Sequence, residues 1–257
     1  MKQGIRMWTR RLMITGAMVL AGAAGCSTSA DHAPVASPSP VPAVSIPADP
    51  AQAFAAAKAR LGTESAHFAQ DTGGDLYGYT GTVDAKTGNW EITGKYYVVR
   101  RVGTELYVQV TGKLPDSTFI DPAILERLNA GGWAHTPLLN GREYSVVFND
   151  KFPWNLANPA LQAKRVTKTG DRTFTGTRTI TQSPYTSHPT RKDLKVSATL
   201  DDQGRFAEID LYADPKNPTR PTIFRFTDYG TPAAITAPPP GDVVEADPTI
   251  LSALVLL

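Results

Sequence analysis

Large apolar residues alternate with polar ones along several stretches of the chain, a pattern typical of β-strands with one buried and one solvated face. The clearest stretches are residues 89–98, 105–111 and 193–200. In the first of these, the expected buried face carries Trp90, Ile92, Gly94, Tyr96 and Val98. Threonines at positions 173, 175, 177, 179 and 181 indicate a further strand with a polar, β-branched face.

Short turn sequences join these stretches at hairpin spacing. They are Asp84–Gly88, Gly103-Thr104 and Asp201–Gly204. Such short connections favour antiparallel hairpins over parallel βαβ crossovers. The sequence therefore predicts a large antiparallel sheet.

A few helices are expected beside the sheet. Asp49-Pro50 is typical of an N-cap followed by a first-turn proline, and Gly62 marks the end of that helix. Asp121-Pro122 begins a second, shorter helix in the same way. The apolar residues 247–257 are too few to span a bilayer and are expected to pack on the domain as a helix or strand. The fold class predicted is α+β, with residues 49–257 forming one domain whose curved antiparallel sheet has helices on one face.

The first 25 residues are predicted to be an export signal. Residues 1–11 contain four basic residues and no acidic one, and residues 12–25 are apolar or small. Two arginines, Arg10 and Arg11, also fit a twin-arginine signal, and both export routes stay open. Small residues directly before Cys26 resemble a lipobox, so we expect a lipidated Cys26, although an ordinary signal peptide with a buried cysteine is the alternative.

Residues 26–48 would follow the anchor as a Pro/Ser-rich tether with almost no large apolar residue. This arrangement predicts an exported protein held on the outer face of the cell membrane by its lipidated cysteine. The membrane is then the first expected partner.

Charge and motif content argue against several other functions. The 26 Lys and Arg residues nearly balance 24 Asp and Glu residues, and removal of residues 1–25 leaves 22 against 24, so a nucleic-acid partner is not expected. A single cysteine excludes a disulfide framework and a cysteine-built metal site. The four histidines are far apart in sequence, and the motifs of serine hydrolases, zinc proteases, P-loop proteins and dinucleotide-binding proteins are absent. We therefore expect no catalytic residues, no metal and no cofactor.

Irregular segments beside the expected strands contain a surplus of large apolar residues. Such residues either complete the hydrophobic core or together cover an apolar cavity. The candidates for a ligand-binding site are Ile120, Leu125, Leu128, Trp133, Phe148, Phe152 and Trp154.

Two segments carry a resemblance to a known family. Residues 99–108, VRRVGTELYV, resemble the "v-g-d-x-l-Y-v" hairpin of exported actinobacterial lipoproteins of the LppX/LprAFG type. Residues 226–238, FTDYGTPAAITAP, are similar to that family's closing strand and its "y-g-x-P-v-x-v-x-x-P" exit. The resemblance implies a LolA-like lipid-carrier fold, in which helices on the concave face of a half-barrel sheet enclose an apolar cavity for acylated lipids. Of functional residues, it transfers only Cys26, as the lipid anchor.

These observations favour a membrane-anchored lipoprotein that binds an acylated lipid or glycolipid and carries it across the cell envelope. The alternative is an envelope sensor of the same fold that contacts a protein partner. In that case, aromatic residues such as Tyr77, Tyr79 and Tyr97 would face outward.

Overall fold

The structure is a computed structural model, and it describes residues 44–73, 78–114, 120–137, 151–182, 190–212 and 221–256. Residues 42–257 form one compact unit. Two of the candidate residues, Cys26 and Phe148, lie outside the described residues.

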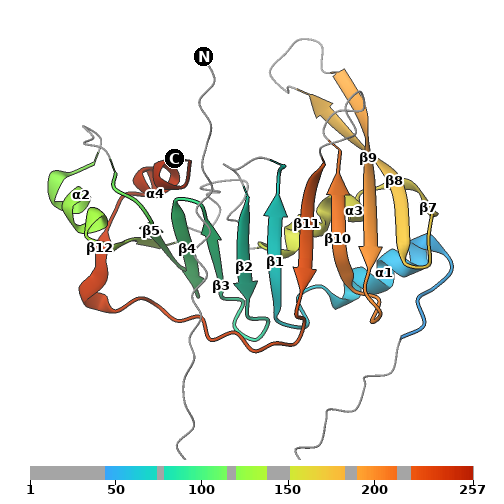
Figure 1. The fold of residues 1–257 in the computed structure, drawn as a ribbon, viewed down its shortest axis with the longest axis horizontal. Helices are drawn as coiled ribbons and strands as arrows, with labels where there is room; N and C mark the ends of the chain where they lie inside the picture. The colour runs from blue at the N-terminus through green and yellow to red at the C-terminus, as the bar shows by residue number, and fades with distance from the viewer. Residues whose placement is uncertain are drawn as a thin grey trace, which may run out of the picture. The chain divides into compact units, whose positions relative to one another are not determined.

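Twelve strands of the described residues form one open, mostly antiparallel sheet (Figure 1). Its strand order is β12-β6-β5-β4-β3-β2-β1-β11-β10-β9-β8-β7. The first half is β1 (Ala66–Asp71), β2 (Tyr79–Val83), β3 (Trp90–Gly94), β4 (Tyr97–Val102), β5 (Glu105–Val110) and β6 (Trp133–Pro137). The second half is β7 (Lys164–Lys168), β8 (Thr173–Gln182), β9 (Thr190–Leu200), β10 (Phe206–Leu211) and β11 (Thr222–Thr227). The short β12 (Val243–Glu245) pairs with β6 in parallel, whereas the other pairs among the described strands are antiparallel.

Pairing of β1 with β11 joins the two halves into one sheet. Phe68 lies opposite Phe226, and Gln70 lies opposite Phe224. The expected α+β class and the large antiparallel sheet are therefore confirmed. The predicted hairpins after β2, β4 and β9 are confirmed as well, and Gly88, Gly103 and Gly204 adopt the positive φ angles that these turns require.

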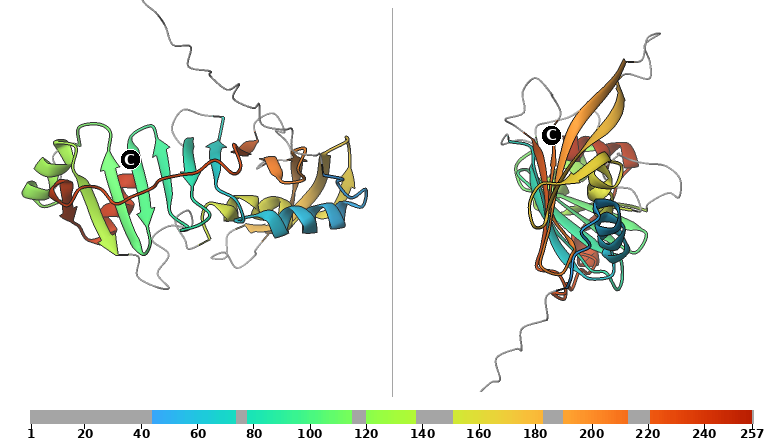
Figure 2. Two further views of the ribbon diagram at one scale, coloured as in Figure 1. Left: turned by 90° about the horizontal axis from the view of Figure 1, so that it is seen from below. Right: turned by 90° about the vertical axis from the view of Figure 1, so that its right-hand side faces the viewer.

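The helices are α1 (Pro50–Arg60), α2 (Pro122–Asn129), α3 (Asn158–Leu161) and α4 (Pro248–Leu256). Single 3₁₀ turns precede α3 and β12, at η1 (Trp154–Ala157) and η2 (Pro240–Asp242). Figure 2 shows α1, α3 and α4 on the same side of the sheet. The contacts agree, because α3 packs on β8, β9 and β10 while α2 and α4 pack on β5 and β6.

Both predicted helix starts are confirmed. The carboxylate of Asp49 accepts a hydrogen bond from the backbone N–H of Gln52 at 2.9 Å, and that of Asp121 accepts one from Ala123 at 2.8 Å. Each is followed by proline at the first helical position.

The prediction of one continuous strand over residues 89–98 is wrong. The chain turns at Lys95 and Tyr96, so β3 and β4 form a hairpin. The turn reverses which residues of the alternating pattern face the core after it. Tyr97 packs against the core, whereas Tyr96 is 38% exposed.

We call the helix-covered side of the sheet the inner face and the opposite side the outer face. The inner face is built from apolar side chains, which alternate along most strands with polar residues of the outer face. Its fully buried members include Trp90, Ile92, Val99, Val108, Phe174, Phe226 and Leu200. The core therefore lies between this face and the helices.

Candidate functional site: a groove between helix and edge strand

A groove of about 420 Å³ runs between α1 and the edge strand β7. This volume lies within the range of small-molecule sites, which is roughly 300–1,000 Å³. Its lining residues are Asp49, Pro50, Ala51, Phe54, Ala55 and Lys58 on the α1 side, and Leu161, Ala163, Arg165 and Val166 on the β7 side. The lining is thus mostly apolar.

Small side chains on α1 create this space. Ala53 and Ala57 are buried against the sheet, while Ala51 and Ala55 line the groove and project only a methyl group. Phe54 anchors the helix, because its ring meets Phe174 at 5.3 Å and Phe206 at 5.6 Å between centroids. A helix with larger residues at the two lining alanines would fill the groove.

Two cations stand in this lining. Arg165 has φ 53° at an irregularity in the β7–β8 register, which re-aims its side chain relative to a regular strand. Its guanidinium pairs with Asp193 at 2.8 Å, and the side chain is 75% exposed. Lys58 is exposed on α1. Asp49 also lines the groove, but its carboxylate accepts the capping hydrogen bond of α1 from Gln52. The groove therefore combines an apolar lining with two cations and one carboxylate at the helix start, which suits an amphiphile whose polar end is anionic.

A second feature is an aromatic cluster at the centre of the inner face. The ring of Phe152 lies 4.8 Å from Trp90, 5.4 Å from Phe68 and 6.2 Å from Tyr79. Tyr79 is only 6% exposed, and its hydroxyl has no hydrogen-bond partner within the described residues. Burial, with a smaller contribution from Tyr97, raises the pKa of Tyr79 above its ordinary value. Within the described residues, the Tyr79 hydroxyl is thus a buried polar group of this cluster whose hydrogen-bonding capacity is unused.

The ligand-binding candidates do not come together in one described hollow. Leu125, Leu128 and Phe152 are buried in the core, and Ile120 and Trp154 are partly buried against it. Trp133 lies on the outer face, where Arg100 sits over its ring at 4.8 Å. None of them lines the α1–β7 groove.

The tyrosines expected to face outward in a sensor do not do so. Tyr79 is buried and Tyr97 packs against the core, so that expectation is wrong for both residues. Tyr77 lies outside the described residues.

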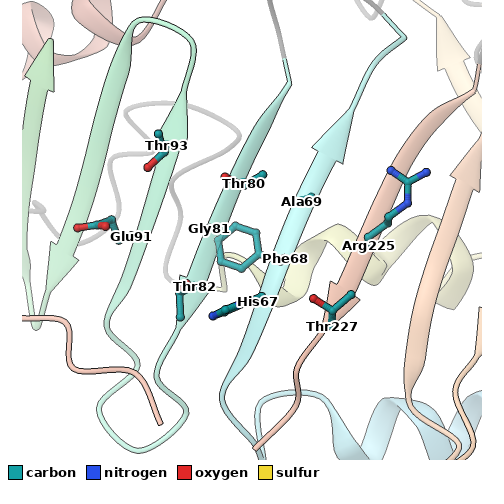
Figure 3. A pocket seen from close by; sticks show the side chains of 10 residues that line it. All are labelled: His67, Phe68, Ala69, Thr80, Gly81, Thr82, Glu91, Thr93, Arg225 and Thr227. Atoms are coloured by element: carbon teal, nitrogen blue, oxygen red, sulfur yellow. The ribbon is translucent and has the colours of Figure 1, made fainter. Parts of the chain in front are cut away.

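The outer face has a shallow hollow of about 410 Å³ across β3, β2, β1 and β11 (Figure 3). Short side chains produce it, namely Ala69, Thr80, Thr82, Thr93 and Thr227. The ionisable residues around it already have partners, since Glu91 pairs with Arg100, Arg225 with Glu208, and His67 lies 3.1 Å from Asp228. This hollow therefore presents mainly threonine hydroxyls and is a weaker candidate than the groove.

Among the described residues, no group of three or more His, Cys, Asp and Glu side chains is arranged to hold a metal ion. In the same part of the chain, no helix has the length and apolar character needed to cross a membrane.

His135 joins the C-terminal segment to the sheet. Its Nδ1 lies 2.7 Å from Glu245 of β12, and its Nε2 lies 2.7 Å from Glu105 of β5. The ring also stacks on Tyr107 at 4.8 Å. Burial alone lowers the pKa of His135, but the hydrogen bonds and charges of Glu245 and Glu105 outweigh it and raise the pKa above its ordinary value.

This arrangement predicts a pH-dependent contribution to stability. Because the folded-state pKa of His135 is raised, the stabilisation is fully present below about pH 6.5 and is lost as pH rises through the folded-state value. We expect His135→Gln to cost of the order of 1 kcal/mol at pH 5.5, after allowing for solvent screening of the exposed Glu245, and less at pH 9. Urea unfolding of both proteins at the two pH values measures this. A matched control is His67→Gln, whose pair with Asp228 is 48% and 59% exposed and should contribute little. An equal cost of His135→Gln at both pH values would contradict the assignment.

The fold and the groove define an α+β protein with one open, mostly antiparallel sheet and an apolar groove at its edge helix. Comparison with models of known protein families and with curated proteins finds no match. The solved structures similar to this chain include an uncharacterized conserved protein from Thermus thermophilus. It is 8% identical, the alignment covers 76% of this chain and 98% of the other, and the TM-score is 0.37. A likeness this distant establishes neither a shared family nor a shared function.

Proposed function

We propose that this protein is an exported, membrane-anchored lipoprotein that binds an acylated lipid or glycolipid and carries it within the cell envelope. The observation that carries the proposal is the α1–β7 groove, whose apolar lining also contains Lys58 and Arg165. An acyl chain would lie along the apolar lining, and the polar end of the lipid would face the two cations.

The energetics of burial support such binding. Each methylene removed from water contributes roughly 0.8 kcal/mol, so ten buried methylenes contribute about 8 kcal/mol before ordering costs. The cost of association and of ordering the chain is subtracted from this gross value, so the net affinity is weaker than the roughly 1 μM to which 8 kcal/mol alone would correspond. Burial of the acyl chain, and not a polar network, would supply most of the binding free energy, in keeping with a protein that has no recognisable catalytic motif.

The fold is compatible with the finer part of the proposal, a LolA-like half-barrel carrier. The large antiparallel sheet with α1, α3 and α4 on one side supports this part of the proposal. In this proposal the protein needs no cofactor, and its partners are the membrane, the lipid cargo and any envelope protein that loads or unloads it.

Filling the groove tests the binding site. Ala55→Trp places an indole in the groove, whereas Ala56→Trp adds the same group at the next, exposed helix position, which does not line it. Residues 42–257, which form a compact unit, would be purified without detergent from an envelope-bearing host and examined by native mass spectrometry. We expect an added mass identified as an acylated lipid in the parent protein and in Ala56→Trp, reduced at least about tenfold in Ala55→Trp.

Two outcomes would count against the proposal. An apo mass in the parent protein that persists after incubation with host lipid extract would overturn lipid binding and favour the sensor. Equal lipid retention in both tryptophan variants would place the lipid outside the groove.

The anchor has its own test. Cys26→Ala removes the thiol that would accept the diacylglyceryl group, and stable attachment requires two acyl chains. We expect the mature variant to move from the membrane fraction to the soluble fraction, as measured by immunoblotting after ultracentrifugation. Retention on the membrane after cleavage of the signal would show that Cys26 is not the anchor.

A further inference from the structure

The charges of this protein are distributed unevenly between the two halves of the sheet. Residues 162–200, which contain β7, β8 and β9, have eight Lys and Arg residues but only two acidic residues. Residues 26–257 as a whole contain 22 Lys and Arg against 24 Asp and Glu. The segment 162–200 is therefore +6, and the rest of the mature chain is −8. Such separation produces a strong local potential in a protein with almost no net charge.

Strands β7, β8 and β9 of this segment form one open edge of the sheet (Figure 1). We call this surface the basic edge, and its exposed cations are Lys164, Arg165, Lys168, Arg172 and Lys195. The carboxylate of Asp193 pairs with the guanidinium of Arg165 at 2.8 Å and accepts a hydrogen bond from the Thr179 hydroxyl at 2.6 Å. Lys168 and Arg172 form no ion pair within the described residues.

The N-terminal tether meets the folded unit at the β9–β10 hairpin, in the same half of the sheet as this edge. The backbone N–H of Val44 donates a hydrogen bond to the carbonyl oxygen of Asp202 in the β9–β10 hairpin, at 3.2 Å. Six residues later the chain enters α1, which contacts β7. The tether therefore joins the folded unit at the half of the sheet that contains the basic edge, so this edge lies within the reach of a membrane-anchored tether.

We propose that the basic edge docks on the anionic headgroups of the membrane. The proposal rests on the membrane anchoring proposed above, and it adds an orientation: the β7 end of the sheet faces the bilayer. The α1–β7 groove then lies at the docked surface, because Arg165 belongs to both. Lipid could enter the groove from the membrane without crossing water.

Lysines on an edge strand also have a simpler use, since they prevent edge-to-edge pairing of two sheets. Charge reversal separates the two roles. A glutamate at the same position still blocks edge pairing, but it repels an anionic surface. The variant Lys164→Glu/Lys168→Glu/Arg172→Glu should therefore keep the oligomeric state of the parent protein and lose membrane binding.

The test uses residues 42–257, so that no lipid anchor contributes. Sedimentation with vesicles of phosphatidylglycerol and phosphatidylcholine is compared with sedimentation with phosphatidylcholine alone. We expect the parent protein to bind the anionic vesicles preferentially, with binding weakened by salt. Because each basic residue contributes about a fivefold gain near such a surface, the triple reversal should weaken binding by about 100-fold or more.

The matched control makes the same charge change on exposed lysines in the other half of the sheet, as Lys86→Glu/Lys95→Glu/Lys113→Glu. It should retain most of the binding. The proposal is overturned if the parent protein shows no preference for anionic vesicles, or if the control triple variant loses as much binding as the basic-edge variant.

Lipid retention in native mass spectrometry is a separate readout. Vesicle binding without any bound lipid would refute the carrier function and leave the docking surface standing.

Discussion

Replacing Phe152 with alanine is expected to lower the free energy of unfolding by about 3–5 kcal/mol. Phe152 is 2% exposed and lies at the centre of the inner-face aromatic cluster, where its ring meets those of Trp90, Phe68 and Tyr79. Its removal would leave a cavity between the sheet and the segment that leads into η1. Three aromatic neighbours held on paired strands cannot close that cavity without moving the strands.

Denaturant unfolding monitored by tryptophan fluorescence measures this loss. Val44→Ala is a suitable control, because Val44 is 43% exposed and its truncation should change stability by less than about 0.5 kcal/mol. A cost below about 1 kcal/mol for Phe152→Ala would mean that the cluster is loosely packed. The placement of Phe152 in the core, in place of the ligand-binding role expected for it, would then be incorrect.

The helices and strands of this fold could be predicted where residues close together in the sequence determine them. Asp49-Pro50 and Asp121-Pro122 specify helix starts because the capping carboxylate and the proline act within one turn. The alternation from Leu194 to Leu200 matches the observed burial for the same reason, since each side chain follows the strand's own period.

The sequence prediction failed where two adjacent strands share the same period-two alternation of apolar and polar residues. Residues 90–98 alternate without an obvious turn signal, because neither Lys95 nor Tyr96 is a typical turn residue. The hairpin between them is favoured by pairing of β4 with both β3 and β5, which is tertiary information. The assignment of Tyr96 to the core and Tyr97 to solvent was reversed as a result.

The candidate site was hidden for a related reason. The groove forms between α1 and β7, which are separated by about a hundred residues in sequence, and it exists because Ala51 and Ala55 are small. The search for large apolar residues identified core positions instead, such as Leu128 and Phe152. Trp133 illustrates the difficulty, since the pairing of β6 with β5 places its side chain on the outer face. Small residues on a helix that covers an edge strand are a sequence signal that could have indicated the groove.

Gly81→Ala is expected to be the most damaging of the single-methyl additions to the sheet. A Cβ atom at this position in β2 would lie 2.7 Å from Cε2 of Phe68 and 2.5 Å from the backbone oxygen of Glu91 in β3. The Phe68 ring is 3% exposed and is held between Phe152 and Tyr79, and the Glu91 oxygen belongs to the paired neighbouring strand. Neither group can move without a large energetic cost. We therefore expect the free energy of unfolding to fall by about 3 kcal/mol, at the upper end of the range for overpacking.

A double-mutant cycle distinguishes this steric cause from a general intolerance of β2 to substitution. Phe68→Leu shortens the side chain that the new methyl group meets, so Gly81→Ala should cost less in the Phe68→Leu background than in the parent protein. Gly112→Ala is the control, because no atom lies within 4 Å of its added Cβ and the change should stay within about 0.5 kcal/mol. Additive costs in the cycle would show that Phe68 does not lie over Gly81. The space over Gly81 is what allows the Phe68 ring to lie across β2 and reach Phe152. Additive costs would therefore mean that the inner face is packed differently where β1, β2 and β3 meet.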